Sequence, residues 1–183
     1  NKRIPGKEHN ILYLGRLVEI KGVEYLIRAM VGIENTTLII AGNGTLRKRL
    51  EGLASSLSVN ARFLGQVSES EKREWLNSAT CLVAPSITLS SSRTESMPVA
   101  IMEALSNGLP IIATRVGGIP EIINDTNGIL VPEKDSHALG NAIKEIISCK
   151  EDNVTLRNNA MRSSVNYDWE NIAKKYERIL AAI

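Results

Sequence analysis

Glu95 and Glu103 are the two carboxylates around which this sequence is organised, and they lie eight positions apart. An apolar segment that begins near Pro98 separates them. Proline suits the first turn of a helix, and Gly108 suits the residue just past its end. We therefore expect Glu95 in a loop before a short helix and Glu103 inside that helix. Paired carboxylates can act as the acid and the nucleophile of a glycosidase, so that reaction is the first possibility.

Two cations and several glycines point to a different chemistry. Arg16 and Lys21 follow the first apolar run of the chain, and a Gly-Asn-Gly turn at 42–44 follows the second. Arginine can hold two phosphate oxygens at once, lysine supplies a point charge, and glycine lets the backbone approach a ligand. A helix N-terminus adds free N–H groups and a positive dipole end. This combination favours a phosphorylated ligand, with Glu95 or Glu103 accepting hydrogen bonds from a ribose diol or a sugar hydroxyl.

Each of these features also has a simpler interpretation. Arg16 and Lys21 could be solvated turn residues, and the turn at 42–44 could merely connect a strand to a helix. The segment 42–47 does not form the dinucleotide-binding fingerprint, because it lacks the third glycine and follows the second predicted strand instead of the first. A dehydrogenase is therefore disfavoured.

The elements that must position these residues alternate between aliphatic strands and amphipathic helices. The predicted strands cover 11–15, 37–42, 61–65, 81–85, 109–113 and 127–131. The predicted helices cover 22–30, 45–58, 68–78, 98–107 and 120–123, and three more begin at Asp135, Asn153 and Trp169. This order predicts the α/β class: a Rossmann-like, doubly wound parallel sheet of about six strands with helices on both faces and the C-terminal helices packed alongside. Right-handed crossovers bring the loops after the strands to one edge, where ligands bind.

The composition is that of an ordinary globular domain. The chain has 183 residues, 43% of them hydrophobic and 23% charged, which is enough for one substantial domain. The net charge of +2 favours neither nucleic acid nor an acidic partner. Cys81 and Cys149 have no metal-like spacing, so we expect no metal site and reduced thiols. No stretch approaches the roughly 18 apolar residues of a membrane span, and no signal peptide is recognisable.

Six ordered blocks, which cover nearly the whole chain, resemble the retaining glycosyltransferases of family four, in the two-Rossmann-domain (GT-B) class. The block Gly15-Arg-Leu-Val-Glu-Ile-Lys-Gly22 is similar to the donor diphosphate loop of that family. The others are the Glu-x7-Glu pattern with its continuation at 95–114, then 116–121, 127–132, the helix start at 135–143 and the closing helix at 169–180. One Glu-x7-Glu pattern is a weak signal, but six blocks in the correct order are specific.

The resemblance implies a role for each candidate site residue. It implies that Arg16 and Lys21 bind the donor diphosphate and that Glu95 contacts the donor sugar near its reacting end, so these three are the expected catalytic residues. It also implies that Glu103 holds the ribose hydroxyls. The other expected substrate-binding residues surround the sugar and phosphates with backbone groups (Gly15, Met97, Pro98 and Val99) or contact the base (Gln66 and Val67).

The resemblance also implies an activity. It is the transfer of a hexosyl group, with retention, from a nucleotide-diphosphate sugar in polysaccharide or glycoconjugate synthesis. A UDP-sugar is the expected donor, a GDP-sugar is the alternative, and no cofactor is expected. The acceptor remains open between a sugar, a polysaccharide and a lipid-linked molecule. Two other functions also remain open: a sugar-nucleotide epimerase of the same fold, and a nucleotide-binding module that is inactive by itself.

The resemblance covers only the C-terminal, donor-binding half of the family's chains. We therefore expect residues 1–9 to be a linker from a missing N-terminal domain, and residues 10–183 to form a single nucleotide-sugar-binding domain. We expect a cytoplasmic protein, with a place at the inner face of the membrane, reached through the missing domain, as an open alternative. Ser96 departs from the family pattern, which usually has glycine there.

Overall fold

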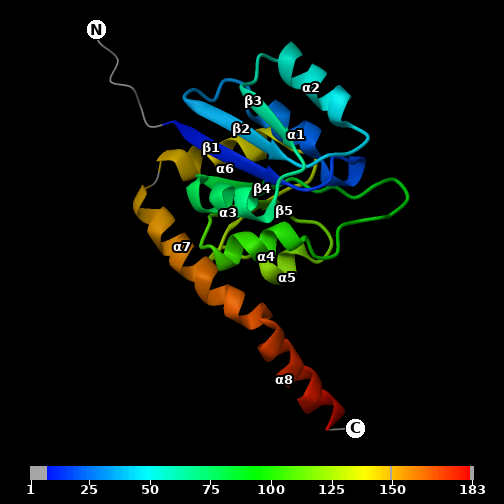
Figure 1. The fold of residues 1–183 in the computed structure, drawn as a ribbon, viewed down its shortest axis with the longest axis vertical. Coiled ribbons are helices and arrows are strands. Elements are labelled where there is room, and N and C mark those ends of the chain that lie inside the picture. Colours follow the sequence, from blue (N-terminus) through cyan, green and yellow to red (C-terminus); the bar gives the residue numbers. More distant parts are fainter. Residues whose placement is uncertain (1–7, 149, 182–183) are drawn as a thin grey trace.

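A six-stranded parallel sheet forms the centre of the computed structural model, which describes residues 8–148 and 150–181 (Figure 1). The strands are β1 (His9–Leu14), β2 (Thr36–Ala41), β3 (Ala61–Gly65), β4 (Cys81–Ala84), β5 (Ile111–Thr114) and β6 (Ile129–Val131). They lie in the order β3-β2-β1-β4-β5-β6, and every neighbouring pair is parallel. The order reverses beside β1, which is where such sheets bind ligands. The predicted doubly wound sheet is confirmed.

Helices cover both faces of the sheet. One layer holds α1 (Val23–Ala29), α2 (Arg47–Ser56) and α6 (Ser136–Ser148), and the other holds α3 (Glu69–Ser78), α4 (Val99–Ser106), α5 (Ile119–Ile122) and α7 (Lys150–Ser164). Successive side chains of a strand point to opposite faces, so Ile11 and Tyr13 pack in the first layer and Leu12 in the second. Both faces are buried, which explains the aliphatic runs in the sequence.

The C-terminal helices leave the sheet at one side. α7 packs against α4, and the short 3-10 helix η2 (Val165–Tyr167) leads into α8 (Trp169–Leu180), which extends past the sheet (Figure 1). Asp168 caps α8 by accepting a hydrogen bond from the Glu170 amide at 3.4 Å. The predicted packing alongside the sheet thus applies to α7. α8 runs beyond the sheet, so most of its surface is exposed, and Trp169 is 82% exposed.

The first strand begins earlier than the sequence pattern predicts. β1 starts at His9, whose amide donates to the Asn35 carbonyl at 3.0 Å. Glu8 accepts a hydrogen bond from the Thr37 hydroxyl at 2.8 Å. The last residue of the predicted linker is therefore part of the sheet, while residues 1–7 of that linker lie outside the described residues.

Candidate functional site

A cleft of about 520 Å³ lies at the edge of the sheet where β1, β2 and β3 end. The loops after these strands, the start of α3 and the segment 95–103 form its walls. Parallel strands deliver their following loops to one edge, so stretches far apart in the sequence meet there. All ten predicted site residues line this cleft: Gly15, Arg16, Lys21, Gln66, Val67, Glu95, Met97, Pro98, Val99 and Glu103.

Lys21 and Glu95 form an ion pair inside the cleft. Lys21 ends the 3-10 helix η1 (Glu19–Lys21), and Glu95 lies in the loop before α4. Their side chains are 18% and 15% exposed, so water screens the pair only in part. The turn after Lys21 depends on Gly22, which has φ +60° and whose Cβ would lie 2.0 Å from the Pro85 carbonyl oxygen. An anion that binds Lys21 must compete with the Glu95 carboxylate.

The loop that carries Arg16 is held from beneath by Tyr13. The buried Tyr13 hydroxyl donates to the Arg16 carbonyl oxygen at 2.8 Å. Burial raises the pKa of Tyr13 above its usual range, and the charge of Glu95 raises it further, so the hydroxyl keeps its proton and remains a donor. On the other side a Cβ at Gly42 would lie 1.8 Å from the Gly15 carbonyl oxygen. The loop backbone is therefore fixed, while the Arg16 side chain is exposed to a ligand.

The loop that carries Glu95 rests on the turn after β5. The Gly118 amide donates to the Glu95 carbonyl oxygen at 3.3 Å. A Cβ at Gly117 would lie 1.7 Å from that same oxygen, and a Cβ at Gly118 would lie 2.2 Å from the Ser96 carbonyl oxygen. Only glycine permits this approach. Ser96 itself has no positive φ, so a serine fits this position without left-handed strain.

The N-terminus of α4 opens into the cleft. Pro98 is the N-cap residue and makes no side-chain capping hydrogen bond, and its carbonyl accepts from the Ile101 amide at 3.0 Å. The amides of Val99 and Ala100, which have no acceptor among the described residues, stay open to a ligand. The side chains of Met97 and Val99 are 52% and 69% exposed, and they form an apolar rim beside these amides. Gly108 follows the helix with φ +60°. The start and the end predicted for this helix are confirmed.

Lys72 is a cleft residue that the sequence did not single out. Its ammonium donates to Glu103 Oε1 at 2.6 Å and to Glu69 Oε1 at 2.9 Å. The hydrogen bond to Glu103, followed by that to Glu69, raises the pKa of Lys72. The available signal was the capping box of Ser68 and Glu71, which fixes the start of α3 and thereby the place of Lys72. Leu14, Ala41, Glu69 and Ala100 also line the cleft without having been singled out.

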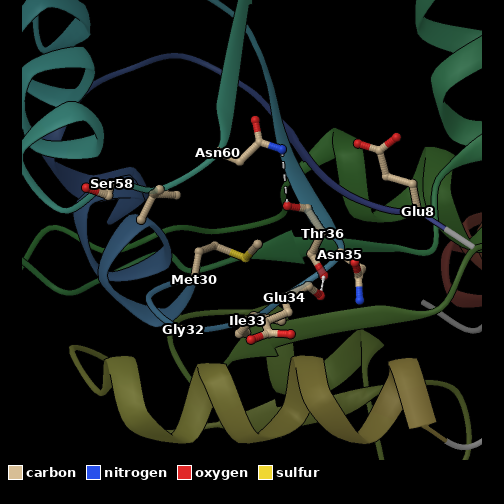
Figure 2. A pocket seen from close by; sticks show the side chains of 10 residues that line it. Glu8, Met30, Gly32, Ile33, Glu34, Asn35, Thr36, Ser58 and Asn60 are labelled. Atoms are coloured by element: carbon tan, nitrogen blue, oxygen red, sulfur yellow. Dashed lines mark hydrogen bonds between the residues drawn. The ribbon is translucent and has the colours of Figure 1, made fainter. Parts of the chain in front are cut away.

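A second cavity, of about 480 Å³, lies at the opposite edge, where β1, β2 and β3 begin (Figure 2). Its described lining residues include the carboxylates of Glu8 and Glu34 and no lysine or arginine. Asn60 donates to the Thr36 carbonyl at 3.5 Å, and the Thr36 hydroxyl donates to the Glu34 carbonyl at 2.9 Å. Carboxylates without a cation repel a phosphate, so the cleft with Arg16 is the candidate site.

Two further observations cover all the described residues. Within residues 8–148 and 150–181, no three His, Cys, Asp or Glu side chains gather in a way that could hold a metal ion. The helices in these same ranges are all too short or too polar to cross a membrane.

Cys81 is a buried free thiol, and burial raises its pKa to about 12. Since the thiolate is the reactive form, Cys81 is inert in the folded domain.

Known proteins are similar to this chain in sequence and in fold. The family model described as glycosyl transferases group 1 matches residues 1–163, and the chain belongs to this family. An uncharacterized glycosyltransferase of Methanocaldococcus jannaschii is 36% identical over 92% of this chain and 43% of its own length. The phosphatidyl-myo-inositol mannosyltransferase of Mycobacterium leprae is 30% identical over 94% of this chain and 46% of its own length. The chain thus spans less than half the length of these curated relatives.

Solved structures have the same fold. The crystal structure of Anabaena HepE in complex with UDP matches with a TM-score of 0.86 and 23% identity, over 98% of this chain and 50% of that chain. Sucrose-phosphate synthase from Thermosynechococcus elongatus matches with a TM-score of 0.83 and 29% identity, over 96% of this chain and 46% of that chain. The sheet described above is therefore the Rossmann-like domain of GT-B proteins.

Proposed function

We propose that the cleft binds a nucleotide-diphosphate sugar and that the chain is the donor-binding part of a retaining glycosyltransferase. The observation that carries the proposal is the gathering of Arg16, Lys21, Glu95 and Glu103 at one edge of the sheet, beside the N-terminus of α4. The cations and open amides suit a diphosphate, and the carboxylates suit ribose and sugar hydroxyls. HepE was crystallised with UDP, which supports a UDP-sugar as the donor, with a GDP-sugar as the alternative.

Each group in the cleft has a role in this proposal. Arg16 and Lys21 bind the diphosphate, Glu103 accepts hydrogen bonds from the ribose hydroxyls, and Glu95 contacts the donor sugar near its reacting end. Lys21 must exchange part of its contact with Glu95 for the diphosphate. The remaining contacts come from the base-binding residues Gln66 and Val67 and from the backbone of Gly15, Met97, Pro98 and Val99.

The proposed chemistry is electrostatic. As the bond between the anomeric carbon and the diphosphate oxygen breaks, negative charge grows on the leaving diphosphate. Arg16, Lys21 and the two open amides at the start of α4 oppose that charge, and such stabilisation is commonly the largest catalytic contribution. The leaving phosphate oxygen takes the proton of the acceptor hydroxyl on the same face of the sugar. The acceptor oxygen bonds to the anomeric carbon on that face, so configuration is retained without a covalent bond to Glu95.

The complete reaction needs more than this chain. We propose a hexosyl donor and an acceptor that is a sugar, a polysaccharide or a lipid-linked molecule. The name of the Mycobacterium leprae relative supports glycoconjugate synthesis. A further domain, N-terminal in the whole protein, completes the acceptor side of the cleft, which accords with the longer chains of the relatives. The whole protein acts in the cytoplasm or at the inner face of the membrane. The chain described here, by itself, binds the donor without efficient transfer.

A thermal-shift panel with UDP, GDP and ADP and their sugars tests the donor proposal. A ligand at 100 times its dissociation constant stabilises the folded state by about 2.7 kcal/mol, which raises the Tm of a domain of this size by roughly 5–10 °C. Arg16→Ala and Lys21→Ala should each remove about half of the shift or more, while Lys48→Ala on the exposed side of α2 should keep it. A panel without any shift would refute the proposal.

Product analysis with a labelled donor distinguishes the possible reactions of the full-length protein. Label that appears in an acceptor, with the anomeric configuration of the donor, supports retaining transfer. Label that appears only in an epimeric nucleotide sugar supports the epimerase instead. Efficient transfer by the present chain alone would contradict the need for a further domain.

A further inference from the structure

Lys72 lies between two carboxylates at the boundary of the cleft. Its ammonium donates to Oε1 of Glu103 at 2.6 Å and to Oε1 of Glu69 at 2.9 Å. Lys72 and Glu103 come from different helices, α3 and α4, and their side chains are 22% and 29% exposed. Glu69 is 85% exposed and lies one turn before Lys72 on the same helix. Lys72 therefore ties the more buried carboxylate to α3.

The position of the Glu103 carboxylate depends on its hydrogen bond from Lys72. A groove of about 330 Å³ runs between α3 and α4 and meets the cleft at Glu69, Lys72 and Glu103. The Glu103 carboxylate thus has two spaces that it can enter, the cleft and the groove. The hydrogen bond from Lys72 engages Oε1, and among the described residues Oε2 has no hydrogen-bond donor. Without Lys72, none of the residues that the structure describes would keep the carboxylate on the cleft side.

We infer that Lys72 is a positioning residue that fixes the Glu103 carboxylate so that its second oxygen accepts the ribose hydroxyls of the bound nucleotide. The inference rests on the function proposed above. Two of the three N–H groups of the ammonium are engaged by carboxylates, which orients the amine. Charge-assisted hydrogen bonds of this length are among the stronger ones, and the raised pKa of Lys72 agrees with them. A solvated surface pair would contribute little to either position.

The test compares two ligands that differ only in the ribose hydroxyls. Kd is measured by calorimetry for UDP, GDP and ADP, and then for the 2′,3′-dideoxy analogue of whichever binds most tightly. In the parent chain we expect the analogue to bind at least about 10-fold more weakly, the usual effect of losing hydrogen bonds to a charged group. In Lys72→Ala this ratio should fall below about 3-fold, while the Kd of the dideoxy analogue changes by less than about 2-fold.

Three variants sharpen the result. Lys72→Arg retains a cation and should restore much of the ratio, and Glu103→Gln should reduce it as Lys72→Ala does. Lys48→Ala removes an exposed lysine from α2, outside the cleft, and should leave the ratio unchanged. A fourth change, Glu69→Ala, removes only the exposed partner, so it should reduce the ratio less than Lys72→Ala, and it provides a second test if Lys72→Ala fails to fold.

The outcomes separate this inference from the function on which it rests. A full ribose ratio in Lys72→Ala would overturn the positioning role. Equal weakening of both ligands would also overturn it, because Lys72 would then contact the base or the phosphates directly. Failure of UDP, GDP and ADP alike to bind the parent chain would refute the proposed function, and the inference with it.

Discussion

Lys21 and Glu95 form an ion pair across 74 positions of the chain, inside the cleft that we assign to the donor. The pair joins the end of η1 to the loop before α4, two segments that the sheet brings to one edge. The Glu95 carboxylate and a bound diphosphate would therefore compete for the Lys21 ammonium. The charge on Glu95 should therefore weaken the binding of a nucleoside diphosphate that carries no sugar.

Removal of that charge should strengthen diphosphate binding. We predict that Glu95→Gln lowers the Kd for the best-binding nucleoside diphosphate by about 2- to 10-fold, as expected for a partly buried pair. Lys21→Ala should raise the same Kd at least about 10-fold. Glu51→Gln is the matched control, since Glu51 pairs with Arg47 on α2 outside the cleft. Calorimetry measures all three, and an unchanged Kd in Glu95→Gln would show that no competition exists.

Substitutions at two glycines with positive φ, Gly32 and Gly117, distinguish the cost of backbone strain from the cost of a steric clash. Gly32 has φ +74° and nothing within 4 Å of a Cβ, whereas Gly117 has φ +53° and the Glu95 carbonyl oxygen 1.7 Å away. Gly32→Ala should lower the free energy of unfolding by about 1 kcal/mol. Gly117→Ala should lower it by about 2–4 kcal/mol and also weaken nucleotide binding, because the loop of Glu95 must move. Denaturant titration measures the free energy of unfolding, and calorimetry measures the Kd of the nucleotide. Equal losses of stability in the two variants would contradict the close contact between Gly117 and the Glu95 carbonyl.

Tyr13 should make the domain less stable at alkaline pH. The pKa of Tyr13 is raised in the folded state, so the unfolded chain loses the phenol proton first, near pH 10. The stabilising contribution is complete below that pH and declines above it, by up to about 1.4 kcal/mol for each pH unit. Tyr13→Phe should reduce this decline and, at neutral pH, cost about 1 kcal/mol for the lost hydrogen bond to Arg16. Urea titrations between pH 8 and pH 11 test this, with Tyr25→Phe as the control, and an undiminished decline in Tyr13→Phe would refute it.

Cys81 should be unreactive until the domain unfolds. Its side chain has no exposed surface, and burial raises its pKa to about 12, so almost no thiolate is available at pH 8. In a Cys149→Ser background, an aromatic disulfide reagent should label no thiol in native buffer and one thiol in denaturant. Rapid labelling in native buffer would mean that β4 is far more open than described.

The location of the candidate site could be predicted from the sequence, largely because it follows from the sheet. Aliphatic runs such as 37–42 read as buried parallel strands, and alternation with helices determines which edge receives Arg16, Gln66 and Glu95. Pro98 and Gly108 mark the helix that carries Glu103, because both act through local backbone geometry.

The contacts of Lys72 and the course of α8 could not be predicted in this way. The partner of Lys72 depends on how α3 and α4 pack against each other, and no local pattern records that arrangement. The periodicity of 169–180 marks an amphipathic helix but does not say what covers its apolar face. The hydrogen bond from Tyr13 to the Arg16 carbonyl could not be predicted either. Arg16 lies in the turn after β1, and the strand pattern alone marks Tyr13 only as a buried strand residue.

An NMR titration of the ¹⁵N-labelled chain with UDP, GDP and ADP shows whether the cleft binds a nucleoside diphosphate. We expect saturable shifts for at least one of them, concentrated at the amides of Gly15, Lys21, Gln66 and Val99 around the cleft. Lys21→Ala should shift the titration to higher ligand concentration. No shift with any of the three, or shifts centred on the opposite cavity lined by Asn35, Ser58 and Asn60 (Figure 2), would contradict binding in this cleft.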